Sequence, residues 1–212
     1  MLRLPSSLWI PFGISVIIAL TVHEFAHAWT AYQLGDDTAQ RMGRLSLNPL
    51  KHLDPIGTIM ILLVGFGYAK PVPFDPYKVT KRTPAGIMLV AAAGPLSNLL
   101  LAIIASIPFQ TGLVASFVAG NGLLALIEKF LVIFISLNLL LLFFNLIPIF
   151  PLDGEKVLSY FLPAGGRATM ARLRPYGPVL LILLIVSGRF GVDLLGMLIR
   201  APANQLTELL IP

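Results

Sequence analysis

Two histidines and a glutamate stand together early in the sequence, in the run His23-Glu24-Phe25-Ala26-His27. Residues four apart share one face of a helix, so the two imidazoles can bind the same divalent cation. Glu24 would lie beside that cation, where a carboxylate can accept a proton from an activated water and pass it to a leaving amine. The pattern therefore predicts a zinc site that hydrolyses peptide bonds.

The surroundings of this motif decide between a functional and a structural interpretation. In a soluble helix, two histidines and a glutamate often form only a solvated face. Here the motif interrupts an apolar segment, Leu8 to Leu34, that is long enough to cross a hydrocarbon core of roughly 30 Å. An unpaired ionisable group at that depth is costly, so the functional interpretation is favoured.

The third metal ligand has to come from elsewhere, because catalytic zinc usually has three protein ligands and one open position. The sequence contains no cysteine, which leaves histidine and carboxylate side chains. Asp153 is the candidate, since it is the first charged residue after the uncharged run Phe130 to Leu152. Pro148, Pro151 and Gly154 can break a helix around it. The structural alternative is an aspartate that caps the next helix.

The elements that must position these residues are those of a membrane protein. Of the 212 residues, 57% are hydrophobic and 12% are charged, about half the charged fraction of an average soluble domain. Apolar spans are predicted over Leu8 to Leu34, Pro84 to Pro108 and Leu123 to Ile147. The sequence leaves open whether Tyr176 to Ser187 also crosses. We predict an α-helical integral membrane protein with about four to five transmembrane helices.

A different kind of segment is expected after the first helix. The apolar stretch Ile56 to Phe66 is too short to cross, and glycine and proline surround it. We therefore predict that Gly43 to Pro76 is re-entrant and partly β, covered by the helices. Within it, Gly67 to Phe74 reads as extended backbone, which can be either an edge that pairs with substrate or a structural loop.

Charge placement predicts the orientation and the partners. The basic loops Arg41 to Arg82 and Lys156 to Arg174 are expected in the cytoplasm, and the uncharged turn Gly112 to Gly122 outside. The active site then faces the cytoplasmic side of what we expect to be a prokaryotic plasma membrane. The net charge of +5 comes from clusters that flank apolar segments, so no nucleic-acid partner is expected.

A single membrane-embedded metalloprotease domain is predicted over residues 1–212, with a catalytic core at 1–160 and C-terminal helices at 161–212. We find no internal repeat and no region polar enough for a separate soluble domain. A removable signal peptide is not expected, because the first apolar run leads into the polar motif and not into a small-residue cleavage site.

The motifs together resemble those of the site-2 protease family of intramembrane zinc metalloproteases, in the compact form without PDZ or CBS domains. The segments that carry the resemblance are His23 to His27, Gly94-Pro95-Leu96-Ser97-Asn98, and Asn145 to Gly154 with its Leu152-Asp153-Gly154 end. It extends from the first helix to about Tyr160.

The resemblance implies one zinc ion bound by His23, His27 and Asp153, with Glu24 as general base and acid. It also implies that Asn98 and Asn145 orient substrate or the developing oxyanion. Hydrogen bonding within the core is an equal alternative for each asparagine.

The resemblance further implies cleavage near the cytosolic side of single-pass membrane proteins or signal-peptide remnants. The sequence does not specify the oligomeric state.

His52 is the remaining histidine. It can act as a gate or a transient ligand in the open zinc position, but a hydrogen-bonded loop histidine is favoured, because a permanent fourth ligand would displace the water. The rival functions are those of a metal transporter and of a membrane zinc-binding protein without proteolytic turnover. The transporter is disfavoured because it commonly shows internal repeats, and the silent binder because metal binding alone does not require Glu24.

Overall fold

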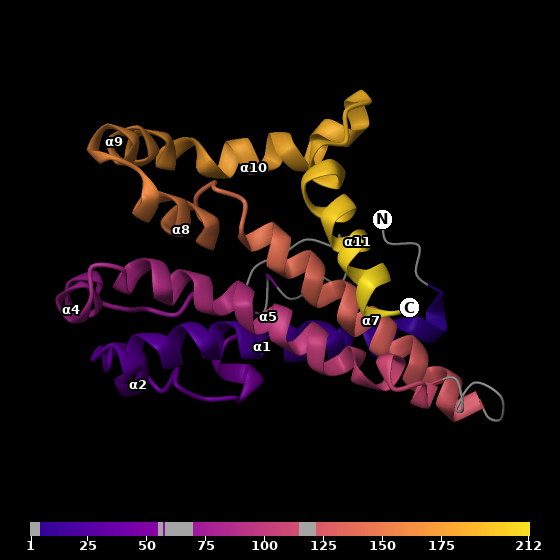
Figure 1. Cartoon of the computed structure of the whole chain (residues 1–212). Helices are drawn as coiled ribbons and strands as arrows, with labels where there is room; N and C mark the ends of the chain where they lie inside the picture. Colours follow the sequence, from indigo (N-terminus) through magenta and orange to yellow (C-terminus); the bar gives the residue numbers. More distant parts are fainter. Residues whose placement is uncertain (1–4, 55–56, 58–69, 115–121) are drawn as a thin grey trace.

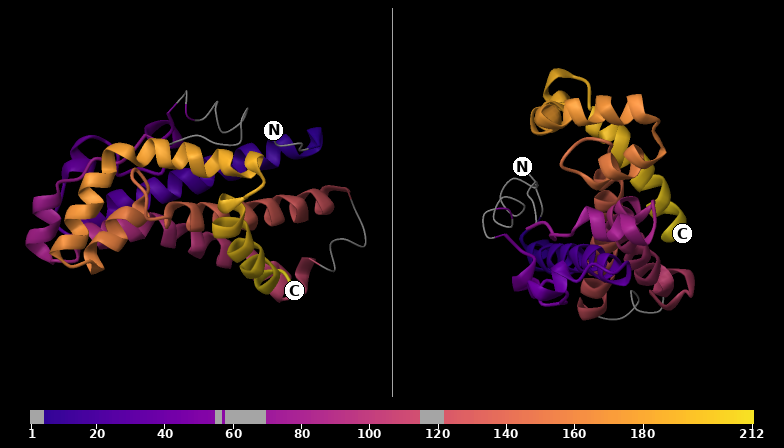
Figure 2. Two further views of the ribbon diagram at one scale, coloured as in Figure 1. Left: turned by 90° about the horizontal axis from the view of Figure 1, so that it is seen from above. Right: turned by 90° about the vertical axis from the view of Figure 1, so that its left-hand side faces the viewer.

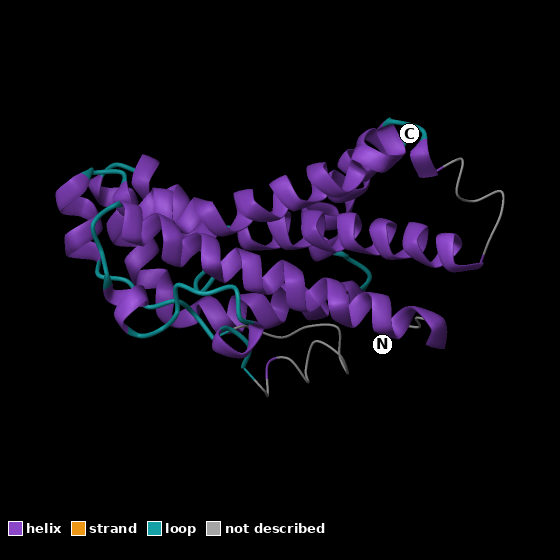
Figure 3. Cartoon of the chain, turned by 90° about the horizontal axis from the view of Figure 1, so that it is seen from below, coloured by secondary structure: helices purple, strands orange, loops and turns teal. Residues whose placement is uncertain are grey.

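The computed structural model describes residues 5–54, 57, 70–114 and 122–212. Figure 3 shows that the regular elements of this described part are helices. The α-helices are α1 (Trp9–Gln33), α2 (Thr38–Arg41), α4 (Pro76–Arg82), α5 (Gly86–Gln110), α7 (Gly122–Asn145), α8 (Asp153–Phe161), α9 (Ala164–Leu173), α10 (Gly177–Val186) and α11 (Ala201–Leu210). Short 3-10 turns lie at Ser6–Leu8, Pro49–Lys51, Arg174–Tyr176 and Ser187–Phe190, and a π turn at Gly196–Arg200.

Four helical stretches of the described residues are long and apolar enough to cross a membrane, which confirms the predicted integral membrane protein. They are Trp9–Gln33, Gly86–Gln110, Leu124–Asn145 and Ala164–Phe190. The first three agree closely with the predicted spans. The fourth begins well before the apolar run at Tyr176, because the helix continues through a basic segment whose long side chains can reach the membrane surface.

The helices α1, α5 and α7 pack together as the core of the molecule (Figure 1). Both α1 and α5 bury small side chains, including Ala19 and Ala28 on one helix and Ala91 on the other. Small residues let helix backbones approach closely where lipid surrounds them. This close approach brings side chains of α1 against the backbone of α5.

The C-terminal helices cover only part of this core. The helix α11 folds back on α5 and α7, where Ala203 packs against Ile135 and Leu139. By contrast, α9 and α10 lie on the opposite side of the molecule from α1 (Figure 2). Exposed apolar side chains such as Ile182 and Leu183 cover α10, as expected for a helix that faces lipid.

The predicted re-entrant, partly β segment is not supported. Of Gly43 to Pro76, residues 55–56 and 58–69 lie outside the described part of the chain. The described remainder contains a 3-10 turn and irregular backbone but no strand. Pro71 and Pro73 have no N–H to donate to a strand, and the oxygens of Lys70 and Pro71 accept hydrogen bonds from the side chain of Arg44.

Candidate metal centre

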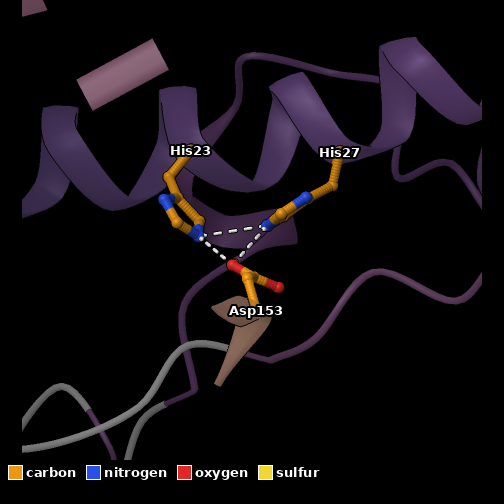
Figure 4. Close-up of side chains that lie close together, drawn as sticks. All are labelled: His23, His27 and Asp153. Atoms are coloured by element: carbon orange, nitrogen blue, oxygen red, sulfur yellow. Dashed lines mark hydrogen bonds and ion pairs between the residues drawn. The ribbon is translucent and has the colours of Figure 1, made fainter. Parts of the chain in front are cut away.

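Three side chains meet where α1 faces the start of α8 (Figure 4). The helix α1 supplies His23 and His27, and Asp153 is the first residue of α8. The Nε2 atoms of the two histidines are 3.1 Å apart. The Oδ2 atom of Asp153 is 3.3 Å from His23 Nε2 and 3.2 Å from His27 Nε2. The three atoms form a nearly equilateral triangle.

This triangle has the dimensions of one face of a zinc tetrahedron. With bonds of about 2.0–2.1 Å from zinc to nitrogen or oxygen, neighbouring ligand atoms of a tetrahedron lie about 3.3–3.4 Å apart. All three side chains are buried, as a closed metal pocket requires. The fourth corner of the tetrahedron is then available for a water or a substrate oxygen.

The protons of both imidazoles are directed away from this triangle. His23 Nδ1 lies 2.7 Å from the side-chain oxygen Oδ1 of Asn98, and His27 Nδ1 lies 2.7 Å from the backbone oxygen of Val90. Each oxygen can only accept, so each Nδ1 must donate. The Nε2 lone pairs therefore point at each other and at Asp153, an arrangement that a cation would stabilise.

One glycine of α5 leaves the space between the ligands open. Val90, Gly94 and Asn98 follow one another at intervals of four residues, so they share the face of α5 that lies against α1. A Cβ atom added at Gly94 would lie 2.3 Å from His27 Nε2 and 2.6 Å from His23 Nε2. Only glycine leaves room for a metal ion there.

The loop after α7 places Asp153. The sequence predicted a span to Ile147 and a helix break near Asp153; α7 ends two residues earlier, at Asn145, and α8 begins at Asp153. Gly154 makes the close approach possible, since a Cβ there would lie 2.2 Å from the backbone oxygen of Leu146. The other oxygen of the Asp153 carboxyl group, Oδ1, lies 3.7 Å from Lys156 Nζ.

Glu24 faces an irregular segment. Its side chain is buried, and its Oε2 accepts a hydrogen bond of 3.2 Å from the backbone N–H of Val72. The buried guanidinium of Arg44 holds that segment in place by donating to the backbone oxygens of Lys70 and Pro71, and it also donates to Lys51. The sequence did not identify Arg44 as a functional residue. The one feature that could have pointed to it is its charge, in a stretch that also contains glycine and serine.

The remaining candidates, His52 and Asn145, are not part of the group of three ligand atoms. His52 is buried, and its Nε2 donates to the backbone oxygen of Ser46 at 2.6 Å, so it is a loop histidine within the described residues. Asn145 is half-buried at the end of α7, where its Nδ2 donates to the backbone oxygen of Leu141 at 3.0 Å. Its side-chain oxygen has no hydrogen bond with the described part of the chain.

A second buried asparagine was not predicted at all. Asn138 of α7 is fully buried, and its Oδ1 accepts a hydrogen bond of 2.8 Å from Asn98 Nδ2. Its own Nδ2 donates to the backbone oxygen of Phe134 at 2.8 Å. The available signal was a lone amide in an apolar span, seven residues before Asn145 and so on the same side of the helix.

Comparison with known proteins gives a consistent result. The profile of Peptidase family M50 matches residues 11–119 and 111–186. The chain is 43% identical over 189 residues to YwhC of Bacillus subtilis, which is named as a candidate zinc metalloprotease, and the match covers 86% of this chain and 83% of YwhC.

More distant relatives carry the same kind of name. Rip2 of Mycolicibacterium smegmatis, also named as a candidate zinc metalloprotease, is 29% identical over 180 residues, which are 81% of this chain and 64% of Rip2. Rip2 of Mycobacterium tuberculosis is 28% identical over 174 residues, with the same two shares. No solved structure matches the chain significantly.

Proposed function

Because this chain belongs to peptidase family M50, we propose that His23, His27 and Asp153 bind its catalytic zinc ion and that Glu24 is its general base and acid. The family and the relatives make the chain an intramembrane zinc metalloprotease of the site-2 type. One observation carries the assignment of residues: three lone-pair-bearing atoms converge beside the open space at Gly94.

The residues divide the chemistry of hydrolysis between them. When bound, zinc lowers the pKa of a coordinated water toward about 7 and polarises the scissile carbonyl. The two histidines offer neutral Nε2 atoms because their Nδ1 protons are held elsewhere, and Asp153 adds a negative charge. Glu24 takes the proton of the attacking water and delivers it to the leaving nitrogen. The Val72 N–H orients the Glu24 carboxylate for both transfers.

The two asparagines of the family-like motifs have different roles in this proposal. The amide of Asn98 is engaged on both sides, by His23 and by Asn138, so we assign it to holding His23. The side-chain oxygen of Asn145 makes no hydrogen bond to a described residue, and we assign Asn145 to binding the substrate. An amide there can bind the unwound peptide backbone.

The rival functions are not favoured. A transporter or a silent zinc-binding protein would need the three ligands but would have no use for a buried carboxylate directly beside them. Glu24 is such a carboxylate, and the family is one of peptidases.

We propose a plasma-membrane location with the active site toward the cytoplasm. Exposed basic residues gather at the end of the molecule where α4 and α9 lie (Figure 1), including Lys81, Arg82 and Arg172. Such clusters favour the cytoplasmic side. The ligands His23 and His27 lie in the half of α1 that leads to this end.

The substrates in this proposal are single-pass membrane proteins or signal-peptide remnants. A transmembrane helix hides its peptide bonds in its own hydrogen bonds, so the substrate must unwind before cleavage. The irregular segment 70–75 lies beside Glu24 and would border the unwound chain there.

The test compares the intact protein with Glu24→Gln in detergent, using a tagged single-span substrate. We expect one zinc per chain in both proteins and cleavage only in the first, because glutamine cannot accept the proton. Glu208→Gln, an exposed glutamate on α11, is the matched control and should cleave normally. Cleavage by purified Glu24→Gln would contradict the proposal.

A further inference from the structure

We propose that Asn138 is a positioning residue that fixes which nitrogen of His23 carries the proton and thereby prepares Nε2 to bind zinc. The inference rests on the proposed metal site but not on the identity of the substrate. It starts from a chain of hydrogen bonds that crosses three helices, from Phe134 and Asn138 on α7 through Asn98 on α5 to His23 on α1.

The far end of this chain sets its direction. The backbone oxygen of Phe134 can only accept, so the group of Asn138 that faces it at 2.8 Å must be the NH₂. The oxygen of Asn138 then faces Asn98 and accepts from its NH₂ at 2.8 Å. Each amide is oriented by the one before it.

At the His23 end of these hydrogen bonds, the orientation of Asn98 determines which group faces the imidazole. With its NH₂ committed to Asn138, Asn98 has only its oxygen to present to His23, at 2.7 Å from Nδ1. A turned Asn98 would present NH₂ instead, and His23 would have to accept at Nδ1 and carry its proton on Nε2. That proton would occupy the lone pair that the metal needs.

Burial ensures that these hydrogen bonds favour one orientation of the Asn98 amide. Asn98 and Asn138 are both fully buried, so no solvent can replace a lost partner. The other contact of the Asn98 NH₂, to the backbone oxygen of Ala19, is long at 3.4 Å. Asn138 is therefore the partner that decides the orientation of Asn98. His27 needs no such device, because a backbone oxygen holds its Nδ1 directly.

The first test reads the proton positions in the protein itself. The sequence has three histidines, so isotope-labelled histidine gives three imidazoles in a nitrogen NMR spectrum of zinc-free protein at alkaline pH. We expect a proton on Nδ1 of His23 and His27 and on Nε2 of His52, whose Nε2 faces a backbone oxygen. The variant His52→Gln assigns the third signal. Wild-type His23 with its proton on Nε2 would overturn the inference.

The second test removes Asn138 without leaving a hole. Asn138→Leu keeps the approximate volume in an apolar helix and deprives Asn98 of its partner. We expect the Nε2-protonated form of His23 to appear and zinc affinity, measured by competition with a chelator, to fall about 10- to 100-fold. Ser15→Ala is the control, since Ser15 is equally buried in α1 and donates to the backbone oxygen of Pro11, away from the hydrogen bonds of Asn98. A variant with wild-type proton positions and affinity would refute the role.

Asn98→Leu completes a double-mutant cycle with Asn138→Leu. The cycle distinguishes a role in positioning His23 from a general contribution to the stability of the fold. Because Asn138 acts only through Asn98, the double variant should bind zinc no more weakly than Asn98→Leu alone. If the losses of zinc affinity in the two single variants multiply in the double variant, Asn138 acts independently of Asn98 and has a merely structural role. Absence of zinc from the wild-type protein would instead count against the metal site, while the proton positions would still test the chain of hydrogen bonds.

Discussion

The metal centre has two sides that are built differently. The imidazole side consists of His23 and His27 with their partners on α5, and each contact there joins regular helices. The carboxylate side consists of Glu24 and Asp153, which depend on irregular backbone at Val72 and in the loop before α8.

This difference assigns the two sides to different tasks. Regular helices hold side chains more precisely than loops do, so the imidazole side is suited to fixing the metal. Irregular backbone leaves N–H and C=O groups unused by helix bonds, so the Glu24 part of the carboxylate side is suited to meeting a substrate, while Asp153 also contributes to binding the metal. Changes on the imidazole side should therefore affect zinc first, and changes around Glu24 should affect cleavage first.

Gly94→Ala should have the largest effect, because it disrupts the imidazole side at its centre. The added methyl would occupy the space beside both Nε2 atoms, and we expect loss of bound zinc and of cleavage together. Zinc analysis of the purified variant measures this. Gly13→Ala is the control, since no atom of the described residues lies within 4 Å of a Cβ there. Full zinc occupancy in Gly94→Ala would mean that the metal lies elsewhere.

Asp153→Asn should rank next. The change keeps the shape of the side chain but removes the charge, so zinc affinity should fall by about 100-fold, and cleavage with it. Chelator competition gives the affinity. Asp193→Asn removes an exposed carboxylate that pairs with Arg200, and it should leave zinc binding unchanged. Equal affinity in the two variants would remove Asp153 from the ligand set.

Arg44→Gln tests the carboxylate side alone. Without the guanidinium, the segment beside Glu24 loses its two contacts at the Lys70 and Pro71 oxygens, so cleavage should fall about tenfold or more while zinc stays bound. The two measurements are initial cleavage rate and zinc content. Arg41→Gln changes an exposed arginine nearby and should cleave normally. Loss of zinc in Arg44→Gln would contradict the proposal that the backbone around Glu24 affects cleavage and not metal binding.

Asp36→Asn should have the smallest effect, because it lies outside both sides and joins α1 to α4. Burial alone would raise the pKa of the Asp36 carboxyl, but Thr38, the Asp75 N–H and Lys78 lower it overall. The stabilisation is therefore complete above the unfolded pKa of about 3.9 and is lost as pH falls through the lower folded pKa.

The expected cost of this substitution at neutral pH is about 1–3 kcal/mol of stability. Zinc affinity should not change. Thermal unfolding in detergent at neutral and acid pH should show a gap between wild type and Asp36→Asn that narrows as the pH falls below about 4. A gap that persists in acid would disprove the role of the ionised carboxylate.

The sequence predicted those features that depend on local pattern. The spacing of His23 and His27 predicted that both lie on one face of a helix. The prolines and Gly154 around Asp153 predicted a break between helices there. The first three spans followed from apolar length. Asn138 could not be linked to His23, because that contact depends on how α1, α5 and α7 align, which no local pattern records. The start of the last span was missed because arginines mark its first turns.

The central claim is that His23, His27 and Asp153 hold one zinc ion. X-ray absorption at the zinc edge, with metal analysis of the detergent-purified protein, tests it most directly. The account predicts one zinc per chain with two imidazole nitrogens in its first shell and an unchanged spectrum in His52→Ala. A first shell with three imidazoles, or loss of zinc in His52→Ala, would contradict it.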